Sequence, residues 1–138
     1  MDAGRRFRAV LSGAPDDCRA LVNWGNALCL RARLLESEGG EQAAEDARAL
    51  YGAAVEKYDA AIAAEPTELG ALTSKGLALQ DLALAVSQSG DTDEAATILK
   101  ESNECMEQAL ASDPTDEAAR TGLERGRRLA RDGRSQGA

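Results

Sequence analysis

The sequence has no histidine, and only 3% of its 138 residues are aromatic. Histidine is the commonest general base, and neither a glycine-rich phosphate loop nor a nucleophile elbow occurs, so we predict no enzymatic activity and no catalytic residue. The three cysteines, Cys18, Cys29 and Cys105, stand at wide spacings that fit no zinc-binding pattern. We expect them to be reduced thiols that pack as small apolar residues, with no metal and no cofactor bound.

Long apolar segments are also missing. No stretch approaches the roughly 18 apolar residues of a membrane span, and residues 1–15 lack the apolar run of a secretory signal. Strand-forming runs of valine, isoleucine and threonine are absent, whereas alanine and leucine dominate the apolar fraction. We therefore predict a soluble, intracellular, all-α protein, either cytoplasmic or organellar, since the arginines near the N-terminus leave an organellar presequence open.

The charge is unevenly distributed along the chain. The net charge is −8, but residues 36–116 hold 18 acidic and 4 basic residues, a local balance of −14. An acidic middle is expected to attract a basic partner and to repel nucleic acid; alternatively, these residues only solvate the outer helix faces. The arginines near the C-terminus are expected to compensate the negative end of the last helix rather than to bind nucleic acid: Arg120, Arg125, Arg127, Arg128 and Arg131.

One stretch of the chain occurs twice. Residues 45–68 recur at 93–116 without a gap, at a constant shift of 48 residues, and each copy ends near a proline, Pro66 or Pro114. Both copies carry small or apolar residues at steps of three and four, which is the pattern of an amphipathic helix. Residues 20–28 match 71–79 as well, so the repeated unit is a helical hairpin. A fixed period of about 20–50 residues is typical of stacked repeats.

The helix signals divide the chain into an arm, a domain and a tail. We expect a flexible arm over 1–14, a domain over 15–131 and a disordered tail over 132–138. Within the domain, unit one covers 15–66, unit two covers 67–114, and a capping helix covers 115–131. Gly39-Gly40 and Gly90 are expected to separate the helices of each unit, and Thr67 and Asp91 to cap the helices that follow them.

The hairpins resemble the tetratricopeptide-repeat (TPR) family, whose signature is W-x2-L-G-x2-Y, then A-x3-F, then P. The matching positions are Leu21, Trp24, Gly25, Leu28, Ala54, Tyr58 and Pro66 in unit one, and Leu72, Lys75, Gly76, Leu79, Ser102, Met106 and Pro114 in unit two. The resemblance implies an α-solenoid in which small residues let paired helices touch, and an aromatic residue or methionine fills the space between hairpins. The repeat-packing residues that it implies are Trp24, Gly25, Ala54, Tyr58, Ala61, Pro66, Gly76, Ser102, Met106, Ala109 and Pro114.

The repeat is longer than that of the family. Gly25 and Gly76 are 51 residues apart and the two prolines 48, against about 34 in the family. The extra residues fall at the hairpin tips, so we expect each helix to be longer by about two turns.

Two elongated repeats, the run Trp24-Gly25-x-Ala27-Leu28 and the acidic middle are similar to the plant-type twenty-kilodalton import receptor of the mitochondrial outer membrane. That resemblance implies a groove for the amphipathic, basic presequences of imported proteins. The receptor also has a C-terminal membrane anchor, whereas this chain ends in Gly-Arg-Ser-Gln-Gly-Ala. Either the anchor lies outside this chain or the likeness is only architectural.

We therefore predict a protein-interaction module, an adaptor or scaffold, that binds a peptide or amphipathic helix, basic in charge, in the concave groove lined by the first helix of each unit. The alternatives are the soluble part of an organellar presequence import receptor, and a structural adaptor subunit, which would expose a large apolar patch. By TPR geometry the groove residues are Val22, Asn23, Asn26, Leu30, Thr73, Ser74, Leu77 and Asp81. We expect Asn26→Ala combined with Leu77→Ala to abolish binding.

Overall fold

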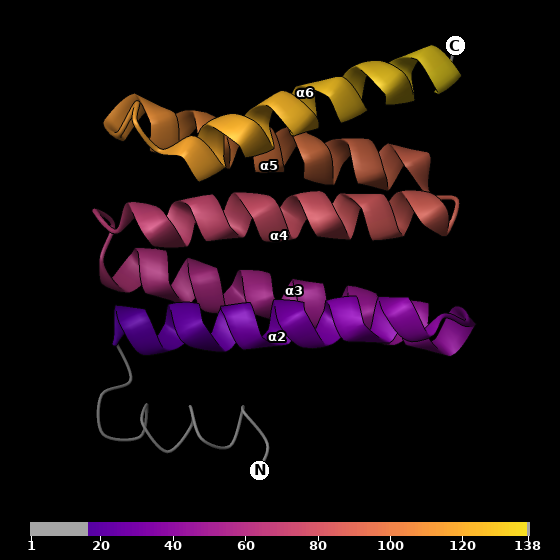
Figure 1. Cartoon of the computed structure of the whole chain (residues 1–138), viewed down its shortest axis with the longest axis horizontal. Coiled ribbons are helices and arrows are strands. Elements are labelled where there is room, and N and C mark those ends of the chain that lie inside the picture. The colour runs from indigo at the N-terminus through magenta and orange to yellow at the C-terminus, as the bar shows by residue number, and fades with distance from the viewer. Residues whose placement is uncertain (1–16, 138) are drawn as a thin grey trace.

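Five helices make up residues 17–137, which are the residues described by the computed structural model (Figure 1). They are α2 (Cys18–Glu38), α3 (Glu41–Ala64), α4 (Leu69–Gln88), α5 (Thr92–Ser112) and α6 (Glu117–Gly137). This range contains no strand, which confirms the all-α prediction. The four helices of the two hairpins have 20 to 24 residues each, in keeping with the expected elongation. The N-terminal arm predicted over 1–14 lies outside the described residues.

Most helix ends follow from local sequence signals. Gly39 and Gly40 adopt φ values of 81° and 97°, a region that residues with a Cβ avoid, and they separate α2 from α3. The side chain of Asp91 accepts a hydrogen bond from the backbone N–H of Glu94 at 3.0 Å, so it caps α5 as predicted. The prediction that Thr67 caps α4 is wrong by one residue, because Glu68 is the cap and accepts from the N–H of Gly70 at 2.9 Å.

The last helix is longer than predicted. The sequence suggested an end near Arg131 and a disordered tail, but α6 continues to Gly137. No proline occurs after Pro114 to stop the helix, and arginines near its C-terminal end stabilise the negative end of the helix dipole.

The helices stack as two hairpins and a final single helix. α2 packs on α3 and α4 packs on α5, while α3 contacts α4 and α5 contacts α6, so the units join in chain order. α2, α4 and α6 also contact their neighbours of the same kind, and they form one face of the stack, with α3 and α5 behind it (Figure 1). This arrangement is a TPR-like helical repeat.

The two hairpins close through equivalent contacts. A Cβ built on Gly25 would lie 2.5 Å from Cε1 of Tyr58, and a Cβ on Gly76 would lie 2.8 Å from Cγ of Met106. Tyr58 and Met106 are 48 residues apart, the shift of the sequence repeat. In the second hairpin, the Ser102 hydroxyl also donates to the Gly76 carbonyl oxygen at 2.6 Å. Small residues therefore bring the paired helices together in both units.

The other predicted packing residues divide into core and surface. Ala54, Ala61 and Ala109 are fully buried, whereas Pro66 and Pro114 are exposed in the turns. Trp24 is half-buried, and its ring faces the ammonium group of Lys57 at 3.9 Å from the ring centroid. Lys75, the residue equivalent to Trp24 in unit two, instead bridges the hairpins through Asp59 at 2.7 Å and Glu101 at 3.4 Å.

α6 approaches the second hairpin through glycine. A Cβ on Gly122 would lie 2.5 Å from Sδ of Met106, and a Cβ on Gly126 would collide with the Asn103 side chain. The buried side chain of Gln80 donates to the Gly122 carbonyl oxygen at 2.9 Å and accepts from Arg125 at 3.1 Å. This helix has few apolar residues, and the close approach of its two glycines to the second hairpin compensates for them.

Candidate functional site

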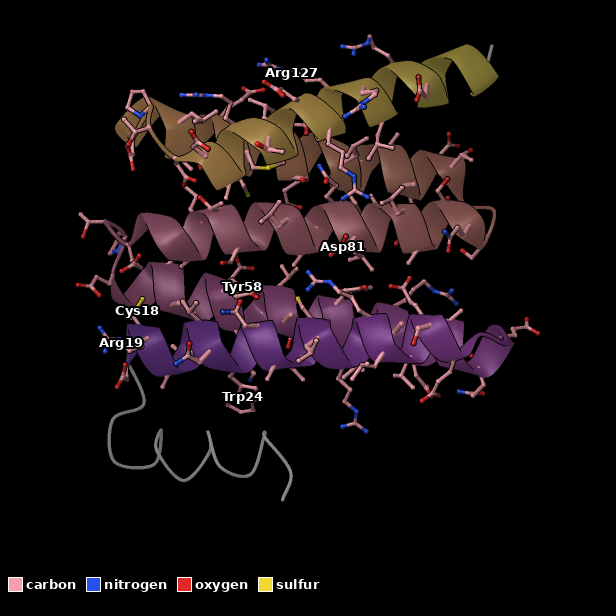
Figure 2. All side chains as sticks on the ribbon, in the orientation of Figure 1. Cys18, Arg19, Trp24, Tyr58, Asp81 and Arg127 are labelled. Carbon is pink, nitrogen blue, oxygen red and sulfur yellow. The ribbon has the colours of Figure 1, made fainter. Side chains whose placement is uncertain are left out.

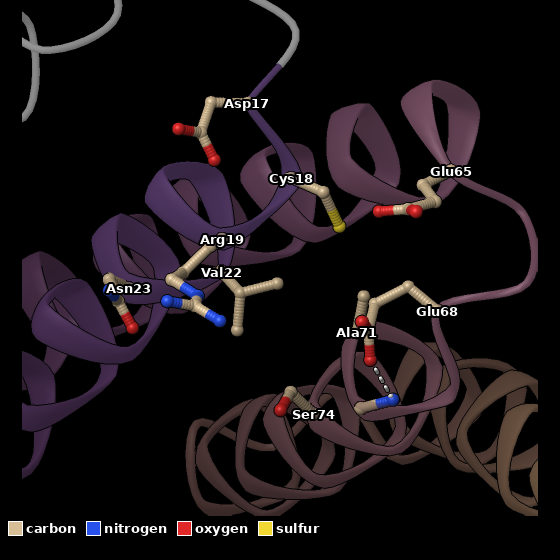
Figure 3. Close-up of a pocket in the computed structure, with 10 residues that line it drawn as sticks. Asp17, Cys18, Arg19, Val22, Asn23, Glu65, Glu68, Ala71 and Ser74 are labelled. Carbon is tan, nitrogen blue, oxygen red and sulfur yellow. Dashed lines mark hydrogen bonds between the residues drawn. The ribbon is translucent and has the colours of Figure 1, made fainter.

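A cleft of about 400 Å³ lies between the first turns of α2 and α4, beside the turn that joins α3 to α4 (Figure 3). Val22 of α2 and Ala71 of α4 supply apolar surface, while Asn23 and Ser74 supply polar groups. The full lining is Asp17, Cys18, Arg19, Val22, Asn23, Glu65, Glu68, Gly70, Ala71 and Ser74.

The acidic residues of the cleft come from its helix starts and its turn. Asp17 caps α2 by accepting from the N–H of Ala20 at 3.2 Å, and Glu68 caps α4. Glu65, the residue that follows α3, donates its backbone N–H to the Ala61 carbonyl oxygen at 2.9 Å, while its side chain makes no hydrogen bond to a described residue. With one arginine, Arg19, against these three carboxylates, the lining carries a formal charge of −2.

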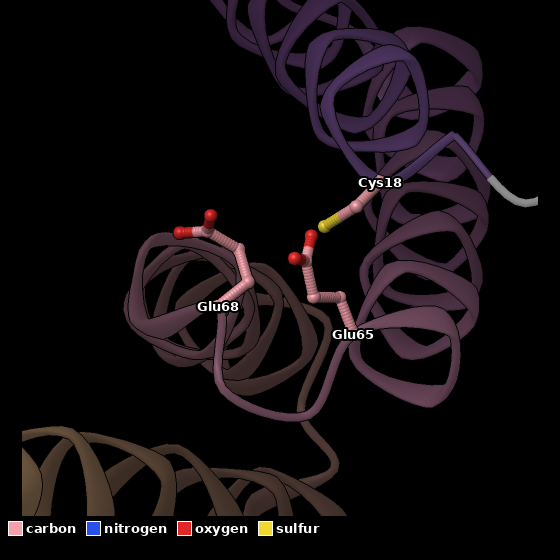
Figure 4. A group of neighbouring side chains, drawn as sticks. All are labelled: Cys18, Glu65 and Glu68. Atoms are coloured by element: carbon pink, nitrogen blue, oxygen red, sulfur yellow. The ribbon is translucent and has the colours of Figure 1, made fainter.

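A buried thiol points into the cleft. Cys18 is only 7% exposed, and its Sγ lies within 4.8 Å of a carboxylate oxygen of both Glu65 and Glu68 (Figure 4). Burial raises the pKa of this thiol, and the negative charges of Glu68 and Glu65 raise it further. The thiol is therefore protonated at neutral pH. Both glutamates are exposed, and exposed acidic groups of this kind are common without an ion, so we assign no metal ion to this group.

Three of the predicted groove residues meet at the cleft. Val22 and Asn23 from α2 line it, and so does Ser74 from α4, about fifty positions later in the sequence. The structure brings them together because α2 and α4 lie side by side on the same face of the stack.

Asn26 has a structural partner. Its Oδ1 accepts a hydrogen bond from the buried Tyr58 hydroxyl at 2.6 Å, and the Cys29 sulfur lies 3.8 Å from the same hydroxyl. Burial raises the pKa of Tyr58, and the neighbouring Cys29 adds to the shift. Asn26 thus satisfies a buried donor of its own hairpin, which uses part of its capacity to contact a ligand.

Thr73 and Leu77 turn toward α6 rather than toward the cleft. Thr73 is buried and donates from its hydroxyl to Asp116 Oδ2 at 2.7 Å. Leu77 packs with the cluster formed by Met106, Ala109, Ala119 and Leu123. TPR geometry places Thr73 and Leu77 in the groove, but α6 covers this side of α4.

Asp81 and Leu30 lie farther along the same face. Asp81 of α4 (labelled in Figure 2) pairs with Arg33 of α2 at 3.1 Å, so an ion pair joins the two helices. Leu30 is 57% exposed, as is Leu34 one turn later, and among the described residues these are the large apolar side chains that face solvent most.

The sequence did not identify Asp17, Arg19, Glu65, Glu68 and Ala71 as site residues. The TPR signature specifies the proline of each turn but neither the residue before it, Glu65, nor the second residue after it, Glu68. The available signal was topological: the turn between hairpins must pass beside the starts of both first helices. Figure 2 shows Cys18 and Arg19 at this end of α2, on the side of the turn.

Most of the acidic middle of the chain lies away from the cleft. By sequence, α3 and α5 carry ten acidic and three basic residues, a net charge of −7, whereas α2, α4 and α6 carry six acidic and ten basic residues, a net charge of +4. Because α3 and α5 do not line the cleft, acidic groups reach it only from its edge, through Asp17, Glu65 and Glu68.

No helix in the described part of the chain is long and apolar enough to cross a membrane. The stacked hairpins, closed by small residues and hollowed between their first helices, define a helical-repeat protein of the TPR-like class. A sequence model described as plant-specific mitochondrial import receptor subunit TOM20 matches residues 5–131, and the chain therefore belongs to this family. No curated protein matches the chain significantly.

Proposed function

We propose that the chain is the peptide-binding part of a mitochondrial protein import receptor, and that it binds basic amphipathic helices of the presequence type along the groove between α2 and α4. The observation that carries the proposal is the cleft between the first helices, found in a chain of the TOM20 family. By the same reasoning, we propose that it acts at the mitochondrial surface.

The chemistry of the groove fits one face of such a helix. Val22 and Ala71 offer apolar contact at the cleft, and Leu30 offers more along α2, while Asn23 and Ser74 offer hydrogen-bonding groups at the edge. An amphipathic helix contacts such a groove through residues at steps of three and four. The polar lining and the small apolar area favour weak, reversible binding, which suits a receptor that must release its ligand.

A permanent structural subunit is less well supported. Such a subunit exposes a large contiguous apolar patch when it is isolated. Among the described residues, the large apolar side chains that are most exposed are Leu30 and Leu34, one turn apart on α2. The apolar surface of two side chains is enough for a transient contact, but it is smaller than the apolar core of an obligate interface.

The test is a titration of the chain with a basic amphipathic peptide, followed by backbone amide NMR. We expect shifted amides around Val22, Asn23 and Ser74, at the start of α2 and α4. A peptide of the same composition, scrambled so that it lacks an apolar face, is the control and should produce much smaller shifts. Shifts confined to α3 and α5 would place binding on the outer face and contradict the groove.

Variants sharpen the test. Ser74→Phe should fill the cleft and weaken binding by about tenfold, a loss of roughly 1.4 kcal/mol. Thr97→Phe adds the same ring to an exposed site on α5, which does not line the cleft, and should leave affinity unchanged. We prefer Ser74→Phe to the pair Asn26→Ala and Leu77→Ala. Those two substitutions would also remove the partner of Tyr58 and contacts to α6, so a loss of binding would be ambiguous.

A further inference from the structure

We propose that the cleft beside Glu65 and Glu68 receives a basic side chain of the bound helix, and that this contact fixes the direction in which the helix lies in the groove. This inference rests on the proposed function and adds to it a charged subsite and a polarity. The ligand group is a guanidinium or an ammonium near one end of the peptide.

The charge distribution leads to this end of the groove. The groove helices are net positive by sequence, and the ion pair between Arg33 and Asp81 already balances the charges midway along them. A basic peptide therefore finds little attraction from the groove helices themselves. At the cleft the lining instead carries three carboxylates and one guanidinium, and two of these carboxylates come from the turn outside the helices.

The acidic groups have free acceptor capacity. Glu68 uses Oε1 to cap α4, which leaves its second oxygen available, and the side chain of Glu65 makes no hydrogen bond to a described residue. Both side chains project into the gap between α2 and the start of α4 (Figures 3 and 4). A cation placed between the two carboxylates would form a charge-assisted hydrogen bond with each of them, and these bonds would compensate for the desolvation of the carboxylates and of the cation.

The buried thiol is an independent observation at the same place. Cys18 is more than nine-tenths buried, points into the cleft and has no hydrogen-bond partner among the described residues. Burial is the main cause of the raised pKa of this thiol, and the negative charges of Glu68 and Glu65 raise it further. Those two negative charges attract a cation.

The chain offers a matched control for the two glutamates. Glu38 and Glu41 are also three residues apart, are also exposed and also flank a turn, but that turn joins α2 to α3 at the other end of the stack (Figure 1). Glu65→Gln/Glu68→Gln and Glu38→Gln/Glu41→Gln therefore remove the same charge from opposite ends of the groove.

The experiment measures peptide affinity by fluorescence anisotropy at low and high salt. The probe is a basic amphipathic peptide, with a second version in which the arginine nearest one end is replaced by norleucine. We expect Glu65→Gln/Glu68→Gln to weaken binding of the arginine peptide by about three- to tenfold at low salt and less at high salt. Glu38→Gln/Glu41→Gln should change affinity by less than about twofold.

The norleucine peptide completes a double-mutant cycle between the peptide arginine and the two glutamates. It should bind the wild-type chain about as weakly as the arginine peptide binds Glu65→Gln/Glu68→Gln, and it should not distinguish the two proteins. Moving the arginine to the other end of the peptide should abolish this coupling, or else reverse the orientation of the bound peptide as seen by a spin label at one end.

Alkylation of the cysteines supplies a second readout that needs no substitution. Bound arginine peptide should slow the modification of Cys18, while Cys29 and Cys105, buried outside the cleft, react as before. Equal affinities for the two double variants, together with an unprotected Cys18, would overturn the subsite and leave groove binding intact. Failure of every amphipathic peptide to bind would instead overturn the proposed function, and the subsite with it.

Discussion

At the scale of single residues, one glycine in each hairpin determines how closely its two helices approach. Gly25 faces the ring of Tyr58, and Gly76 faces both the Met106 side chain and the Ser102 carbonyl oxygen, at 3.2 Å from a built Cβ. An aromatic ring in a full core is rigid, whereas a methionine side chain adapts. Replacement by alanine is therefore expected to destabilise the fold more at Gly25 than at Gly76, unless the Ser102 carbonyl oxygen prevents relaxation at Gly76.

Replacement of Gly25 by alanine tests this contact. We expect Gly25→Ala to lower the free energy of unfolding by about 1–3 kcal/mol, because the new methyl group overlaps the Tyr58 ring. Urea denaturation followed by circular dichroism measures the change. Gly52→Ala is the control: its Cβ would meet nothing within 4 Å, and it should stabilise α3 by about 0.5–1 kcal/mol. Equal stability of Gly25→Ala and the wild type would contradict the close contact.

At the scale of elements, Asp116 joins α6 to α4. Its Oδ1 accepts from the N–H of Ala119 at 3.0 Å, which caps α6, and its Oδ2 accepts from the Thr73 hydroxyl at 2.7 Å. The hydrogen bond from Ala119 contributes most, and that from Thr73 next, to a lowered pKa of this carboxyl. One side chain thus ends a loop, starts a helix and ties that helix to the second hairpin.

The lowered pKa gives a pH dependence with a definite sign. A carboxyl whose pKa is lower in the folded chain stabilises the fold above its unfolded pKa, near 3.8, and this contribution is lost as the pH falls through the folded value. Thermal unfolding between about pH 5 and pH 2 should therefore show a drop in stability that is smaller in Asp116→Asn. Thr73→Val should reduce the drop in the same direction. An identical acid profile for Asp116→Asn and the wild type would contradict the linkage.

The helices were predictable from the sequence because their signals are local. Glycine pairs, the Asp91 cap and the 48-residue repeat depend on neighbours along the chain, and they gave the order and approximate ends of all five described helices. The contact of Gly126 with Asn103 and that of Gly122 with Gln80 join distant segments. They depend on how α6 lies across the second hairpin, which no local pattern specifies.

The candidate site was predictable to a similar extent. Val22, Asn23 and Ser74 follow from the helical positions of a TPR-like hairpin, and they line the cleft. Thr73 occupies an equally plausible helical position but is covered by α6. Glu65 stands after the end of α3, where helical periodicity stops, so only the path of the turn in three dimensions brings it to the site.

At the scale of the whole molecule, charge is separated between two faces. α3 and α5 carry a net charge of −7 by sequence, whereas α2, α4 and α6 carry +4. Packed helices lie about 8–10 Å apart, which is close to the Debye length of about 10 Å at 0.1 M salt. At that ionic strength a peptide in the groove is largely screened from the outer face, and at low salt it experiences the charge of the entire chain.

This separation predicts that steering and contact have different kinetic effects. Glu45→Gln/Glu56→Gln removes two exposed charges from α3, away from the cleft, and should slow association with a basic peptide at low salt by about twofold while leaving dissociation unchanged. Glu65→Gln/Glu68→Gln removes charges that contact the ligand under our proposal, and should chiefly accelerate dissociation. Stopped-flow fluorescence at two salt concentrations separates the two rates. If both variants slow association equally and neither changes dissociation, the acidic residues at the cleft attract the peptide only at long range, and the bound helix makes no contact with them.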